Sequence, residues 1–167
     1  MHKLLVITIL IAFSVQAPAQ TNDQNAFARL KLMQGLWKGR ESHGGVPHAA
    51  SVVYKVQDSG KSVVETEKFD DGHELRITYH LQAGNLFAII DQRSKYPGRL
   101  KYVHGIEEQQ LRFDSLVPAD KSSIEFELQS LRLNFIGPNH IAIDYARFSR
   151  SKTTVLGKFD LHRTLKR

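Results

Sequence analysis

The sequence predicts an all-β protein: an antiparallel barrel of eight or more strands, preceded by one short helix near the N-terminus. Three observations predict this fold. Apolar residues after residue 40 recur at every second position, short turn-forming stretches separate these runs, and only one stretch before residue 40 has helical spacing. A long meander would leave two unpaired edges, and closure into a barrel removes them.

The helix is predicted over residues 25–33, where Phe27, Leu30 and Met33 recur at helical intervals. Asp23 precedes this stretch and is predicted to cap it, and Gly35 is predicted to end it.

The strands follow as runs in which one face is apolar and the other polar. The apolar sets are Val52, Tyr54 and Val56; Leu75, Ile77, Tyr79 and Leu81; Leu100, Tyr102, His104 and Ile106; Leu111, Phe113 and Ser115; Ile141, Ile143, Tyr145 and Arg147; and Val155, Gly157, Phe159, Leu161, Arg163 and Leu165. Turn-forming residues lie between the runs, at 58–60, 70–72, 83–85, 96–98 and 137–139.

Length and composition fit a single exported domain. The chain has 167 residues, 41% of them hydrophobic, and no cysteine, which excludes disulfides, thiol catalysis and Cys-bound metals. Lys3, the apolar run 4–13 and Ala17-Pro18-Ala19 together are typical of a signal peptide. We therefore expect a signal peptide over 1–19, a barrel domain over 20–167, a periplasmic or secreted location, and no stable membrane anchor.

The segment Gly35-Leu36-Trp37-Lys38-Gly39 resembles the Gly-x-Trp opening of lipocalin-like (calycin-type) barrels. The rest of the chain resembles an uncharacterised bacterial lipocalin-like family, in which a His-Tyr-Cys stretch usually stands where this chain has 89–93. Further similar segments are 62–66, 77–81, 131–135 and 159–164. The resemblance implies that Trp37 closes one end of the barrel and that Arg163, from the last strand, covers its ring.

The apolar faces also carry polar side chains, and these form the predicted ligand site. Alternation directs Tyr79, Tyr102, His104, Tyr145 and Arg147 to the inner faces of their strands. An inward Arg cannot lose its charge, so we expect Arg147 to anchor an anionic group. The alternative is that the tyrosines hydrogen-bond one another or the backbone.

Other polar residues predict no additional site. Glu65 and Glu67 share a strand face, which is compatible with a pair of carboxylates, but the adjacent Lys68 and the polar setting favour a solvated edge. The histidines lack metal-ligand spacing within any one strand or helix, so we expect no metal and no cofactor. Catalytic motifs and phosphate-binding loops are missing from the sequence. Because the protein is predicted to be exported and its basic residues are interspersed with acidic ones, we expect no nucleic-acid partner.

Three functions remain open from the sequence. The first is a barrel that binds a small apolar or anionic molecule. The second is an enzyme that uses His104 and a tyrosine as an acid–base pair, and the third is a packed barrel that acts as a structural or interaction module. The sequence leaves the oligomeric state open.

Overall fold

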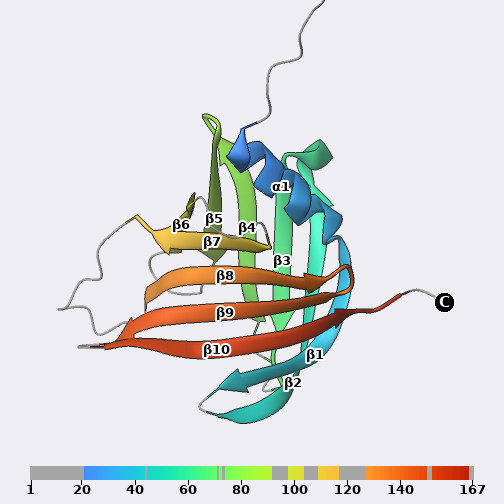
Figure 1. Cartoon of the computed structure of the whole chain (residues 1–167), viewed down its shortest axis with the longest axis vertical. Helices are drawn as coiled ribbons and strands as arrows, with labels where there is room; N and C mark the ends of the chain where they lie inside the picture. The colour runs from blue at the N-terminus through green and yellow to red at the C-terminus, as the bar shows by residue number, and fades with distance from the viewer. Residues whose placement is uncertain are drawn as a thin grey trace, which may run out of the picture.

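The structure, a computed structural model, describes residues 21–43, 45–70, 72, 74–91, 98–103, 109–116, 127–149 and 152–165. The described residues form one closed antiparallel barrel of ten strands with one α-helix, which confirms the predicted fold class (Figure 1). The predicted signal peptide and His104 lie outside the described residues.

The strands follow one another in chain order around the barrel, and β1 pairs with β10 to close it. Their bounds are β1 Gly35–His43, β2 Val46–Gln57, β3 Ser62–Lys68, β4 Glu74–Gln82, β5 Asn85–Asp91, β6 Gly98–Val103, β7 Gln110–Ser115, β8 Glu127–Gly137, β9 His140–Ser149 and β10 Lys152–Arg163. A short 3₁₀ turn, η1 (Asp58–Gly60), connects β2 to β3. Leu165 was predicted to continue the last strand, but β10 ends before it and Leu165 is exposed.

The helix α1 (Asn22–Leu32) begins earlier than predicted, because Thr21 caps it instead of Asp23. Thr21 and Gln24 form a reciprocal capping box, which satisfies two backbone donors at the start of the helix. Asp23 is buried, and its carboxylate accepts a hydrogen bond of 2.7 Å from the backbone N–H of Leu86 on β5. The predicted cap is therefore wrong, and Asp23 attaches the helix to the barrel. No helix among the described residues is long and apolar enough to span a bilayer.

The helix lies across one end of the barrel (Figure 1). Its buried residues Phe27 and Leu30 join the apolar interior, and the guanidinium of Arg29 lies 3.8 Å from the centre of the Phe135 ring near the end of β8. Apolar side chains from every strand complete the core. One end of the interior is thus covered by α1.

The contact between β1 and β10 depends on Gly39. A Cβ atom at this position would overlap the backbone carbonyl oxygen of Asp160 on β10. Glycine allows this close approach of the two backbones, and the pairing of Trp37 with Arg163 and of Gly39 with Leu161 continues along the seam.

Candidate functional site

Two glutamates of β3 lie inside the barrel, against the expectation of a solvated edge. Glu65 and Glu67 are both fully buried. They continue the inward face of Val63, because alternate residues of a strand point the same way. The prediction from Lys68 was wrong because β3 pairs with β2 on one side and β4 on the other, so it has no free edge.

Tyrosines from two sides of the barrel contact these carboxyl groups. The Tyr79 hydroxyl on β4 donates a hydrogen bond of 2.5 Å to Glu65 Oε2. The Tyr145 hydroxyl on β9 lies 3.4 Å from Glu65 Oε1 and also contacts Glu67 Oε1. Tyr54 on β2 is the register partner of Glu65, and its hydroxyl is buried without a hydrogen bond of normal geometry among the described residues. We call these five residues the Tyr–Glu cluster.

Burial controls the ionisation of the cluster. Removal from water raises the pKa of Glu65 above its ordinary value of 4.5, and hydrogen bonds from Glu67, Tyr79 and Tyr54 offset part of this rise. Burial, reinforced by the charge of Glu65, also raises the pKa values of Tyr54 and Tyr79 well above their ordinary value. The tyrosines therefore stay neutral donors, and a hydrogen bond between the two carboxyl groups requires a proton on one of them.

The cluster thus places hydroxyl donors and carboxyl groups within an otherwise apolar core. Such a group can bind the polar end of a small molecule, and a carboxyl with a raised pKa can also exchange a proton with it. The sequence signal that could have located the glutamates is the period-two series Val63, Glu65, Glu67, which places both carboxyls on an apolar face.

The structure brings together two of the five predicted ligand-binding residues, since Tyr79 and Tyr145 both contact Glu65. Tyr102 is half-buried, and its ring packs 5.7 Å from that of Phe113, which in turn lies 5.4 Å from Tyr79. It therefore adjoins the cluster through an aromatic contact. Arg147 lies on β9 opposite Leu128 and Thr154, and its side chain, like His104, is outside what the structure describes.

Trp37 and Arg163 meet at the helix-covered end. Trp37 is buried, and its indole N–H donates a hydrogen bond of 2.8 Å to the Met33 carbonyl. The Arg163 guanidinium lies 4.7 Å from the centre of the Trp37 ring and donates a hydrogen bond to the Leu32 carbonyl. The two residues therefore connect β1 and β10 to the end of α1.

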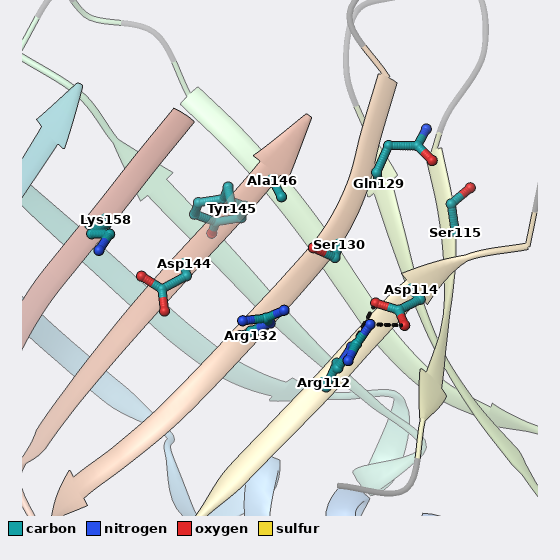
Figure 2. A pocket seen from close by; sticks show the side chains of 10 residues that line it. All are labelled: Arg112, Asp114, Ser115, Gln129, Ser130, Arg132, Asp144, Tyr145, Ala146 and Lys158. Atoms are coloured by element: carbon teal, nitrogen blue, oxygen red, sulfur yellow. Dashed lines mark hydrogen bonds and ion pairs between the residues drawn. The ribbon is translucent and has the colours of Figure 1, made fainter. Parts of the chain in front are cut away.

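A groove of about 500 Å³ lies on the barrel wall, where it crosses β7, β8, β9 and β10, and Tyr145 is among its lining residues (Figure 2). Its charges are largely compensated. Arg112 forms an ion pair of 2.8 Å with Asp114, and Asp144 is the register partner of both Arg132 and Lys158. We therefore regard the interior cluster as the stronger candidate site.

The comparisons with known proteins support the fold only. No protein-family model and no curated protein matches this sequence. Among solved structures, the chain is similar to Rv2717c from M. tuberculosis, with a TM-score of 0.58 and 12% sequence identity, over 84% of this chain and 98% of that one. At this identity the similarity establishes a shared antiparallel barrel, and it carries no site residue from one protein to the other.

Proposed function

We propose that this chain is an exported lipocalin-like (calycin-type) barrel that binds a small, largely apolar molecule in its interior. The observation that carries the proposal is the hydrogen-bonded group of Tyr79, Glu65 and Tyr145 within apolar walls. A few convergent polar groups in an apolar enclosure are the usual composition of a small-molecule site.

The width of the barrel supports the proposal. Eight strands give an interior that side chains fill or that holds one small ligand, and the diameter increases with each strand. This barrel has ten strands. The Tyr54 hydroxyl is buried beside Glu65 without a hydrogen bond of normal geometry among the described residues. A buried hydroxyl with poor hydrogen-bond geometry is unfavourable, and a well-aligned hydrogen bond to a bound molecule would improve it.

The cluster favours a neutral or basic polar group on the ligand. Burial raises the pKa of Glu65, so its ionised form is unfavourable inside the barrel. An anionic group would place a further negative charge beside two carboxyls, whereas an ammonium group would stabilise the ionised carboxylate. The anionic anchor at Arg147 remains a prediction, because it depends on a side chain outside the described residues.

Three probes that share a dodecyl chain and differ in their polar group test the proposal by isothermal titration calorimetry. We expect dodecylamine and dodecanol to bind the wild type more tightly than dodecanoate. Glu65→Gln should weaken amine binding by about 30-fold or more, the effect of losing one partner of a buried charge pair. Glu74→Gln is the matched control, because Glu74 is an exposed carboxylate on β4 that pairs with Lys68 on the outer side.

Each other result favours a different interpretation. If dodecanoate binds most tightly and Arg147→Met abolishes this binding, Arg147 and not the Tyr–Glu cluster anchors the polar group of the ligand. Failure of all three probes to bind would favour the packed structural or interaction module.

Export is a separate part of the proposal and has its own test. The apolar run 4–13 followed by Ala17-Pro18-Ala19 supports removal of residues 1–19. N-terminal sequencing of protein exported by a bacterial host should give Gln20 as the first residue. A chain that keeps Met1 and remains inside the cell would contradict it.

A further inference from the structure

A group of three metal-ligating side chains lies on the outer wall of the barrel, far in sequence from the β3 glutamates. His140 opens β9, directly after the turn at 138–139, and its register partner on β10 is His162. Asp160 is two residues before His162, so the two share a face of β10. Alternation along β10 brings Asp160 and His162 to one face, and the pairing of β9 with β10 adds His140.

The ligand atoms of the three residues converge. His140 Nε2 lies 2.5 Å and His162 Nε2 lies 3.9 Å from the same oxygen, Asp160 Oδ1. One ligand atom from each residue falls within 4.8 Å of the others. The two imidazole rings stack with their centres 4.1 Å apart and their planes 23° from parallel. The strand pair therefore holds both rings beside one carboxylate.

We propose that His140, Asp160 and His162 form a binding site for a divalent zinc-like cation. Zinc accepts imidazole nitrogen and carboxylate oxygen at about 2.0–2.2 Å, and a tetrahedral site separates its ligand atoms by about 3.4 Å. The observed separations of 2.5 and 3.9 Å lie on either side of this value, so small side-chain rotations suffice. Three protein ligands leave one coordination position for water or another ligand.

The charges around the site determine its affinity for a cation. The register partners of His162 and Asp160 on β1 are Lys38 and Arg40, two exposed cations on the neighbouring strand. Their charge opposes a divalent cation, while Asp160 attracts it. The side chains of Asp160 and His162 are 67% and 65% exposed, so a cation can reach them directly from solvent. We therefore expect a reversible surface site rather than a permanently occupied one.

Titration of zinc into the full chain, produced without an affinity tag, tests the site by calorimetry. We expect one zinc ion per chain with the wild type. His162→Ala and Asp160→Asn should each weaken binding by about 100-fold or more, since even a group that only positions a ligand contributes about 10- to 100-fold. His48→Ala is the matched control, because His48 is another exposed histidine beside an aspartate, Asp70, with a nitrogen–oxygen distance of 3.9 Å.

A thermal-unfolding series with and without zinc keeps the test independent of folding defects. Zinc that bridges β9 and β10 should raise the melting temperature of the wild type and of His48→Ala, and leave those of the two site variants unchanged. Circular dichroism checks that each variant folds. If one of the two site variants does not fold, His140→Gln is measured in its place. The proposal is overturned if wild-type binding is absent, or if His48→Ala reduces it as much as His162→Ala does.

Discussion

Tyr145 on β9 and Glu65 on β3 meet inside the barrel, with the tyrosine hydroxyl 3.4 Å from Glu65 Oε1. By the shorter route around the barrel, β10, β1 and β2 separate the two strands. The contact therefore joins distant parts of the wall through the interior, and it makes the Tyr–Glu cluster a structural element as well as a candidate site.

Removal of the Tyr145 hydroxyl should destabilise the fold. Tyr145→Phe removes a hydroxyl donor shared by two buried carboxyl groups, and we expect the free energy of unfolding to fall by about 1–3 kcal/mol. Urea denaturation measures the change. Tyr54→Phe is the contrasting variant, because it removes a buried hydroxyl that makes no hydrogen bond of normal geometry among the described residues. A loss of stability in Tyr54→Phe equal to that in Tyr145→Phe would contradict the assigned contacts.

Stability should decrease as pH rises through the range where Glu65 ionises in the unfolded chain. Burial raises the pKa of Glu65 in the folded state above the ordinary value of 4.5. Above that pH the unfolded chain releases the proton while the folded chain keeps it, so the free energy of unfolding falls until the folded pKa is passed. Below the ordinary value the contribution is fully present.

Urea denaturation at several pH values between about 4 and 8 measures this dependence. Glu65→Gln cannot ionise and should flatten the decrease. Glu74→Gln, which alters an exposed carboxylate on β4, should preserve it. The same slope in Glu65→Gln and the wild type would show that Glu65 is not responsible.

Loss of Arg163 should weaken the helix-covered end of the barrel. Arg163→Ala removes the cation–π contact with Trp37 and the hydrogen bond to the Leu32 carbonyl, which together stabilise by about 1–3 kcal/mol. Trp37 is the sole tryptophan, so its fluorescence reports directly on this end. We expect a shifted emission maximum and lower stability. Arg76→Ala, an exposed arginine on β4, should change neither measurement.

Gly39→Ala should impair the closure of the barrel. Its Cβ would overlap the carbonyl oxygen of Asp160, and relief requires β1 and β10 to separate. We expect a loss of about 1–3 kcal/mol in the free energy of unfolding, typical of overpacking. Gly137→Ala is the control, because the nearest atom to its added Cβ lies at an ordinary 4.0 Å. Equal effects of the two substitutions would show that the seam has room.

The sequence predicted the architecture because most strands alternate cleanly. On β4, Ile77 and Tyr79 are buried while Arg76 is exposed, and the pattern is visible without a structure. No alternating run was predicted over β5, since Leu86, Phe87 and Ala88 are buried in succession. The His80 ring and the Arg99 guanidinium, from the strands on either side, contact the Phe87 ring and contribute to its burial. The burial of β5 therefore does not alternate along the strand.

The site was only partly predictable, for two physical reasons. Alternation along one strand correctly predicted that Tyr79 and Tyr145 point inward. A carboxylate beside a lysine is usually solvated, and for this reason Glu65 and Glu67 were wrongly placed at a solvated edge. The group of His140, Asp160 and His162 depends on register between β9 and β10. Spacing rules compare residues within one strand or helix, so they cannot detect ligands that two strands contribute.

Pairing of the first strand with the last also constrains when the barrel can form during translation. Arg163 and its hydrogen-bond partner Leu32 are 131 residues apart in the chain. While the ribosome is still making β9, one edge of β1 has no strand to pair with, and exposed strand edges promote aggregation. Contacts of such long sequence separation also slow folding. The sheet therefore stays open, with unpaired edges on β1 and on the last strand made, until β10 has emerged, so pairing of β10 with β1 is the last step in forming the barrel.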